Sequence, residues 1–491
     1  MEYRLEELSA LELADLIKSK KVTPTEVIKY FIDRIENRNP SLNALVYTKY
    51  EYALGEAKKL EEKIKNNEEL QAFSGVPFVL KDFLDSKKGW TSSHGGVKSL
   101  IKIDAIDSEF CKAMEALGGI AIGKSNAPSF GFRATTYNEL YGFTNNPFDT
   151  RYNSGGSSGG TAAAIADGLV PIGEGGDAGG SIRCPASWCN VFGFKASAGF
   201  IPNYCRPDAW AATHPFCCNG GLTKTVTDAA ILLNEMAKYE PRDPLSVSTN
   251  GVDFVKEMNK GIKNLRIAYT LDFDLFPLDE QVKKVFLDAI EKLKIKGTCI
   301  DLVHFKFKRS LKEYSDMWCK SISFDTAIEM QLMKEKGLDL VGEHAEELPE
   351  QFIYWNKKAS EINAMDLYDF NLARTEVLDA FQDVFDNYDI ILSPVTACPP
   401  VLNKEKGIGP SEINGVKVDP LIGFAETFLV NFIGNPAASV PAGLVEGKLP
   451  VGLQVIGRRY HDGDVLAVSK VFEEINPWRK NYKIPFTRKL K

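Results

Sequence analysis

Residues 153–183 read NSGGSSGGTAAAIADGLVPIGEGGDAGGSIR, and this stretch decides how the rest of the chain is interpreted. It holds ten glycines in 31 residues, compared with 39 in the 491 residues of the whole chain. A flexible linker would be rich in glycine and serine throughout, whereas here the glycines flank Thr161–Ala166, a run of strong helix formers. Gly168 stands where a helix cap is expected. The stretch therefore predicts a turn, a helix, a strand and a second turn.

Strand and helix signals alternate on both sides of this stretch. The apolar runs Val76–Leu80 and Gly119–Gly123 are typical of buried strands, with a helix expected over Glu109–Leu117 between them. Further strand signals appear at Asp389–Pro394 and Val451–Gly457. Such alternation predicts an α/β fold.

Two capping boxes mark helix starts near the N-terminus. Ser9 with Glu12, and Thr23 with Glu26, have the spacing at which a side chain and the backbone satisfy each other's free donors. The second helix is expected to stop at Pro40, because proline lacks the N–H that continues a helix.

A single domain, 1–491, is expected rather than three separable ones, because the chain has no internal repeat and no Pro/Gly-rich boundary. Its parts are N-terminal helices (1–65), a glycine-rich core (66–230), a helical and variable middle section (231–385) and a C-terminal sheet and helix (386–491).

Composition and charge exclude several classes of protein. A net charge of −7 with 44% hydrophobic and 25% charged residues excludes a disordered chain and a supercharged nucleic-acid binder. No apolar run approaches the ~18 residues of a spanning helix, and the acidic, amphipathic N-terminus is not a signal peptide. Nine cysteines without a C-x-x-C pair favour free thiols in a reducing compartment. We therefore expect a cytoplasmic protein with no nucleic-acid or membrane partner.

Ser181 and Lys81 are the residues whose surroundings point to chemistry. Gly179 and Gly180 let the backbone turn tightly before Ser181, so that successive N–H groups can point at one developing negative charge. Lys81 ends an apolar run, and burial would lower its pKa enough to make it a base near neutral pH. Each residue alone has a plainer interpretation: a serine in a solvent loop, or a lysine paired with Asp82.

Other catalytic patterns are missing from the sequence. None of the five histidines lies in a glycine turn, and no metal-ligand spacing appears, so no metal and no cofactor are expected. Gly155–Gly159 spells G-x-S-x-G, but Arg151–Ser154 precedes it where a hydrolase elbow needs an apolar strand. A phosphate loop is the main rival for 153–160, although no G-K-[ST] follows. Cys184 and Cys189 are expected to be buried core thiols. For a hydrolase, Ser–Lys chemistry is the option left.

These residues together resemble the amidase signature family of Ser–cisSer–Lys amide hydrolases, and the resemblance covers almost the whole chain. It is carried by motifs at Gly155–Gly160, Asp177–Ala186, Gly193–Lys195, Gly221–Thr223, Asn145–Pro147, Gly123–Asn126, Leu392–Thr396, Gly434–Ala438 and Pro450–Gln454. The family implies a large mixed β-sheet core covered by helices on both faces.

The resemblance also implies a role for each matching residue. The nucleophile, the bridging serine after a cis peptide bond and the base would be Ser181, Ser157 and Lys81. The backbone N–H groups of the oxyanion hole would be those of Ala178, Gly179, Gly180 and Ser181, and the substrate pocket would include Gly131 and Phe132. The implied activity is hydrolysis of a small-molecule amide through an acyl-enzyme, without metal, cofactor or protein partner. A homodimer is compatible with the sequence.

The sequence departs from the family pattern at four places, one of which is Phe194–Ser197 in place of the usual Leu-Lys-Pro-Ser/Thr. Gly176 stands where a serine or threonine usually helps to hold the lysine, and Glu174 stands where an apolar residue is commoner. Cys184 replaces the glutamine found in the A-type subunits of aminoacyl-tRNA amidotransferases, which argues against that branch. The chain looks most like acylamidases and 6-aminohexanoate cyclic-dimer hydrolases. The alternatives are a catalytically degenerate member, which Gly176 favours, and a glutamine-dependent amidotransferase A-type subunit.

Substrate specificity is expected to reside in the segments that vary most in the family, here 125–140, 203–220 and 310–365. Trp210, Trp318 and Cys319 are candidate pocket residues, although aromatic residues at such spacings more often belong to a core. The apolar and aromatic side chains of these segments favour an apolar chain over a charged amino acid such as glutamine.

Overall fold

The centre of the structure is one large mixed sheet. The computed structural model describes residues 3–83, 85–294 and 297–490. Within them, eleven strands join in the order β1 (Leu45–Thr48), β5 (Ile120–Ser125), β2 (Pro77–Lys81), β8 (Ile172–Asp177), β10 (Cys218–Thr223), β9 (Phe192–Lys195), β16 (Ala437–Val445), β17 (Leu449–Gly457), β13 (Ile390–Pro394), β11 (Ile267–Tyr269) and β12 (Ile300–Leu302). β2 is parallel to β5 and β8, and β11 is parallel to β12 and β13, whereas the other neighbours are antiparallel.

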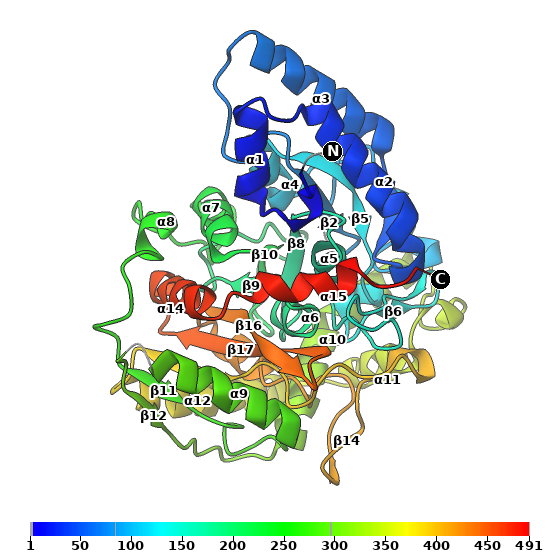
Figure 1. The fold of residues 1–491 in the computed structure, drawn as a ribbon. Coiled ribbons are helices and arrows are strands. Elements are labelled where there is room, and N and C mark those ends of the chain that lie inside the picture. Colours follow the sequence, from blue (N-terminus) through cyan, green and yellow to red (C-terminus); the bar gives the residue numbers. More distant parts are fainter. Residues whose placement is uncertain (1–2, 84, 295–296, 491) are drawn as a thin grey trace.

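Helices cover both faces of this sheet, as the resemblance implies. They are α1 (Ala10–Lys18), α2 (Pro24–Leu42), α3 (Tyr50–Lys65), α4 (Glu109–Ala116), α5 (Gly159–Ala166), α6 (Arg183–Cys189), α7 (Val226–Met236), α8 (Phe254–Glu257), α9 (Glu280–Lys294), α10 (Leu311–Glu335), α11 (Glu350–Ala359), α12 (Ala364–Phe385), α13 (Phe428–Ile433), α14 (Asp462–Ile475) and α15 (Lys483–Phe486). Figure 1 shows α1–α3 (blue) at one end of the sheet and α9 with α12 at the other. Side chains of α4, α7 and α14 share one hydrophobic core, and those of α2, α5 and α6 share another.

In the described part of the chain, three two-stranded ladders lie outside the main sheet. They pair β3 (Thr91–Ser92) with β4 (Lys102–Ile103), β6 (Tyr137–Asn138) with β7 (Gly142–Phe143), and β14 (Glu412–Ile413) with β15 (Val416–Lys417). Among the helices of the described residues, none combines the length and the apolar character needed to cross a membrane.

The first two helices begin where their capping boxes predict, but one expected end is wrong. α2 continues through Pro40 to Leu42, and Asn43, with a φ of 53°, ends it. The missing N–H of Pro40 frees only the carbonyl of Glu36, an exposed residue near the helix end, where water can satisfy it. A proline in the last turn therefore does not terminate this helix.

The glycine-rich stretch forms α5 and β8 with turns before and after them, as its sequence predicts. β2 pairs in parallel with β8, with Val79 opposite Gly173. Because neighbouring parallel strands end at the same edge of a sheet, the end of β2 at Lys81 and the loop after Asp177 meet at that edge. The sheet thus brings together two candidate site residues that lie about a hundred positions apart.

Candidate active site

Lys81 and Ser157 are in direct contact in the buried part of the site. Lys81 Nζ donates to Ser157 Oγ over 2.8 Å, and each residue is only 2% exposed. The ring centroid of Phe83 lies 5.6 Å from the same Nζ. Burial lowers the pKa of Lys81, because desolvation disfavours the ammonium form, and the nearby carboxyl of Glu174 opposes this effect. The burial that a lysine base needs is therefore present.

Ser157 and Ser181 lie on two turns that are joined by a backbone hydrogen bond. Ser157 follows a cis peptide bond with Gly156. The N–H of Ser158 donates to the carbonyl oxygen of Ser181 over 3.2 Å. Ser181 is partly exposed, whereas Ser157 and Lys81 are buried. A ligand arriving from solvent would thus meet Ser181 before the two buried groups.

Asp177 holds the loop that leads from β8 to Ser181. Its carboxylate accepts the N–H of Gly180 (2.8 Å) and that of Ile182 (3.2 Å), and it forms a fully buried ion pair with Arg183, whose Nη2 lies 2.8 Å away. Burial alone would raise the pKa of Asp177, but the charge and hydrogen bonds of Arg183 lower it to about 2. The loop is therefore fixed around an ionised carboxylate.

The loop N–H groups divide into two kinds. Among the described residues, the N–H groups of Ala178, Gly179 and Ser181 have no hydrogen-bond acceptor, which leaves them free for an oxyanion. The sequence-based prediction places the N–H of Gly180 in the oxyanion hole, but in the structure this group donates to the carboxylate of Asp177. The hydrogen bond from Gly180 to Asp177 therefore stabilises the loop instead.

Two side chains from distant segments support this loop. Thr427 Oγ1 donates to the carbonyl of Gly179 over 2.6 Å, and the indole N–H of Trp318, on α10, donates to the carbonyl of Ala178 over 3.0 Å. Gly180 has a φ of 127°, and a Cβ there would collide with Thr427. Thr427 was not found from the sequence, since it lies outside the motifs and its contact depends on the tertiary fold.

The candidate pocket residues fall into different environments. A Cβ on Gly131 would lie 3.3 Å from Ser157 Oγ, so this glycine adjoins the site. The ring of Phe132 lies 6.4 Å from that of Trp318 and 5.3 Å from that of Phe352, a residue the sequence analysis did not single out. Of the two other candidates, Trp210 is 58% exposed, and Cys319 is buried in a hydrophobic core.

Two of the residues that depart from the family pattern, Glu174 and Gly176, lie on β8. Glu174 is fully buried, and its Oε2 accepts the backbone N–H of Lys81 over 3.0 Å. A Cβ on Gly176 would meet only Asn219 Oδ1, at 3.4 Å, so its place is open enough for a small side chain. The strand thus lacks the usual hydroxyl at Gly176, whereas the carboxyl group of Glu174, two positions earlier, contacts the backbone of Lys81.

The cysteines near the loop are buried, as expected from the sequence. Burial raises the pKa of Cys184 to about 12 and that of Cys189 well above its usual range. Thiols with such raised pKa values carry too little thiolate to act as nucleophiles.

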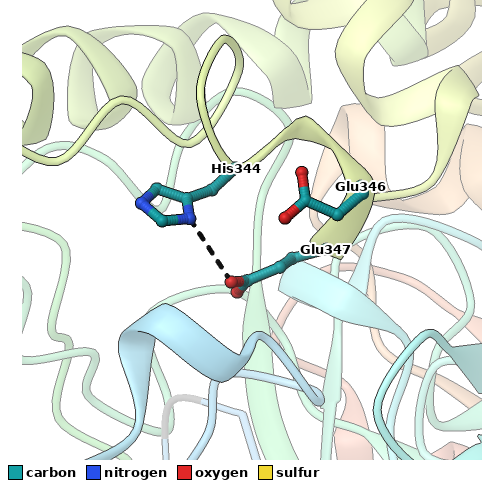
Figure 2. Close-up of side chains that lie close together, drawn as sticks. All are labelled: His344, Glu346 and Glu347. Carbon is teal, nitrogen blue, oxygen red and sulfur yellow. Dashed lines mark ion pairs between the residues drawn. The ribbon is translucent and has the colours of Figure 1, made fainter.

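One group of side chains among the described residues has metal-ligand character. Figure 2 shows His344, Glu346 and Glu347, with an ion-pair line between the ring of His344 and Glu347. Glu347 already accepts the N–H and the O–H of Ser99, each over 2.7 Å. These contacts explain Glu347 as a tether between its own segment and the short helix Lys98–Leu100.

Several known proteins are similar to this chain over nearly its whole length. The acylamidase of Rhodococcus erythropolis is 30% identical over 97% of both chains. The A-type subunit of a glutamyl-tRNA(Gln) amidotransferase from Thermoanaerobacter pseudethanolicus is 32% identical over 96% of both chains. The crystal structure of a bacterial aryl acylamidase of the amidase signature family is 39% identical, with a TM-score of 0.96 over 99% of this chain and 100% of that one. A 6-aminohexanoate cyclic dimer hydrolase, 24% identical with a TM-score of 0.85 over 97% of this chain and 98% of that one, shares the fold.

The length of the match to a family model shows which family the chain belongs to. The model of the family described as Amidase matches residues 26–466, which is most of the chain. This range includes the two glycine turns, β2 with Lys81 and the middle section. The chain therefore belongs to the amidase family, as its signature motifs predict.

Proposed function

We propose that this protein hydrolyses a small carboxylic amide through an acyl-enzyme on Ser181, with Ser157 as the proton relay and Lys81 as the base. Amide hydrolysis itself follows from the family and from the acylamidase relatives. The roles of the three residues are the proposal. The observation that carries it is the 2.8 Å contact between buried Lys81 Nζ and Ser157 Oγ, next to the partly exposed Ser181.

The reaction would proceed by two acyl transfers. Neutral Lys81 takes a proton from Ser157 while Ser157 takes one from Ser181, and Ser181 Oγ attacks the amide carbonyl carbon. The negative charge on the carbonyl oxygen is stabilised by the free N–H groups of Ala178, Gly179 and Ser181. The relay then returns its proton to the leaving amine. Water repeats the attack on the ester and releases the carboxylate.

The substrate is proposed to be neutral and apolar next to the reacting carbonyl. The aromatic rings of Phe132, Trp318 and Phe352 form one contact group, and Trp318 also touches the oxyanion loop. An aliphatic or aryl group buried against such rings is favoured by the apolar area removed from water. An aryl or alkyl amide therefore fits better than a charged amino acid.

The alternative is the A-type subunit of a glutamine-dependent amidotransferase, since relatives of that name are about as similar as the acylamidase. Cys184 argues against this alternative, because it stands where that branch has glutamine. A degenerate, non-catalytic member is disfavoured by the intact Lys81–Ser157 contact.

A substrate panel tests the proposal. Aliphatic amides, aryl amides, linear and cyclic aminohexanoate oligomers and glutamine are offered to the purified chain, with and without a chelator. We expect turnover of a neutral amide that a chelator does not change, and a serine-directed phosphonyl fluoride should label Ser181. Glutamine as the only substrate, or a requirement for an added subunit, would support the amidotransferase instead.

We also propose that the chain acts as one domain in the cytoplasm, alone or as a homodimer. The single domain is supported by the main sheet, which combines strands from the N-terminal part of the chain (β1), the middle section (β12) and the C-terminal part (β17). The cytoplasmic location is supported by the nine cysteines, all of which are free. Light scattering at several concentrations distinguishes a monomer from a homodimer.

A further inference from the structure

Two buried acidic side chains lie near Lys81, and the proposed proton relay uses neither of them. Glu174 is fully buried on β8, and while its Oε2 accepts the N–H of Lys81, its Oε1 has no donor among the described residues. Asp85 is 4% exposed, and its carboxyl group is within hydrogen-bonding reach of Glu174. Two carboxyl groups thus face each other next to the lysine.

This arrangement requires a proton between the two carboxyl groups. Ionised carboxylate oxygens are acceptors only, so Glu174 and Asp85 can bond to each other only when one of them is protonated. Burial raises the pKa of Asp85, and burial together with the charge of Asp85 raises the pKa of Glu174 well above its usual range. Both pKa directions favour a pair in which the two carboxyl groups hold one proton and one negative charge between them.

We propose that Glu174 and Asp85 are positioning residues for the base: sharing one proton, they place a single fixed negative charge beside Lys81. The proposal rests on the proposed role of Lys81 and extends it. The hydrogen bond from the Lys81 backbone fixes the end of β2. The charge stabilises the ammonium form and so sets the pH at which Lys81 becomes a base.

The other ionisable groups around Lys81 and the carboxyl pair are already engaged or neutral. Asp177 is paired with Arg183, and burial raises the pKa of the Cys217 thiol, which keeps it protonated at neutral pH. Lys124 lies 2.6 Å from the carboxylate of Asp104. The groups that face Lys81 or the pair from neighbouring elements are Cys217, Asp177 and Lys124.

The test compares three variants: Glu174→Gln, Asp85→Asn and the double variant. Each amide keeps the shape of the side chain and can donate to the remaining carboxylate. Each single variant therefore retains one negative charge, whereas the double variant retains none. The readout is the acid limb of kcat/KM as a function of pH, with Lys81→Ala measured alongside.

We expect both single variants to keep the acid limb near its wild-type position. The double variant should move it to lower pH by about one unit or more, because one negative charge, acting through an effective dielectric of about 20, is removed from beside Lys81. Its plateau rate should fall severalfold, because a weaker base removes the proton less readily.

Two results would overturn the proposal. An acid limb of the double variant that coincides with that of the wild type would show that the pair does not act on the base. A shift in each single variant as large as half of the shift in the double variant would show that both groups are ionised and share no proton. High activity of Lys81→Ala is a different outcome, which would reject the proposed base itself.

Infrared spectroscopy keeps the proposal testable if the double variant fails to fold. Wild type at neutral pH should show a protonated-carboxyl band that both single variants lack. Other buried acids, such as Glu426, remain in all three proteins and cancel in the difference spectrum. Retention of the whole band in both single variants would contradict the shared proton.

Discussion

The indole N–H of Trp318 donates to the carbonyl of Ala178 over 3.0 Å, and its ring lies against Gly179. α10, which carries Trp318, belongs to the middle section, the part of the chain whose motifs resemble the family least. This helix nevertheless touches the loop that precedes Ser181. A substitution in the variable section can therefore change the rate of reaction as well as the choice of substrate.

Replacing Trp318 with phenylalanine keeps an aromatic ring but removes the hydrogen bond. We expect kcat to fall about fivefold, since a net hydrogen-bond contribution of about 1 kcal/mol corresponds to about that factor. KM should change less, because the apolar contact with Phe132 is retained. Steady-state kinetics on the best amide of the panel give both constants.

The matched control for this variant is Trp355→Phe. Trp355 is also buried in the same hydrophobic core, but it belongs to α11. The control should leave kcat within about twofold of the wild type, apart from any loss of stability. A Trp318→Phe variant with raised KM and unchanged kcat would show that Trp318 only lines the pocket.

Ser181→Ala should abolish turnover while the fold remains intact, because the proposed nucleophile is removed. Ser157→Ala should lower kcat by several orders of magnitude as well. The double variant should lose little more than Ser181→Ala alone, since both residues serve one relay and their effects are not additive. Circular dichroism checks the fold. More than a tenth of wild-type kcat in Ser181→Ala would reject the nucleophile.

Lys81 should work as a neutral amine, so activity should fall toward acid pH as Lys81 becomes protonated. Burial lowers its pKa, which places this limb below the range of an exposed lysine. Lys81→Arg should be nearly as damaging as Lys81→Ala, because a guanidinium group does not give up its proton in a protein. An arginine variant with near-normal rates would refute the role of Lys81 as base.

The order of helices and strands could be predicted from the sequence because local signals and tertiary packing agree. Capping boxes place the starts of α1 and α2 correctly, and the apolar run before Lys81 forms β2. The end of α2 could not be predicted from Pro40, because the outcome depended on whether solvent reaches a single carbonyl group. Local sequence does not contain that information.

The site could be predicted only where residues lie in motifs. Lys81, Ser157 and Ser181 stand at motif positions, and the structure brings Lys81 to Ser157. Thr427 and Asp85 carry no such signal, since each reaches the site from a segment whose place depends on the whole fold. Glu174 did give a signal, as an unusual residue in a strand, but its contact with Lys81 needed coordinates.

The ion pair between Asp177 and Arg183 predicts a loss of stability when it is broken. Arg183→Met leaves the carboxylate of Asp177 buried without its cation, and it also removes hydrogen bonds to Asn431 and Gln454. The free energy of unfolding at pH 7 should fall by about 3–5 kcal/mol. The control Arg266→Met breaks a solvent-exposed pair with Asp389 and should lower the free energy of unfolding far less.

The loss in Arg183→Met should also depend on pH, with a definite sign. The folded-state pKa of Asp177, about 2, lies below the value of about 3.9 in an unfolded chain. The ion pair therefore contributes fully above pH ~4, and its contribution declines as the pH falls toward 2, because over this range the unfolded chain takes up a proton that the folded protein does not. Urea unfolding at pH 7, 4 and 3 should show the difference between wild type and Arg183→Met shrinking below pH ~4. A difference that stays constant over this range would mean that the loss comes from the packing of Arg183 and not from the charge that holds the loop before Ser181.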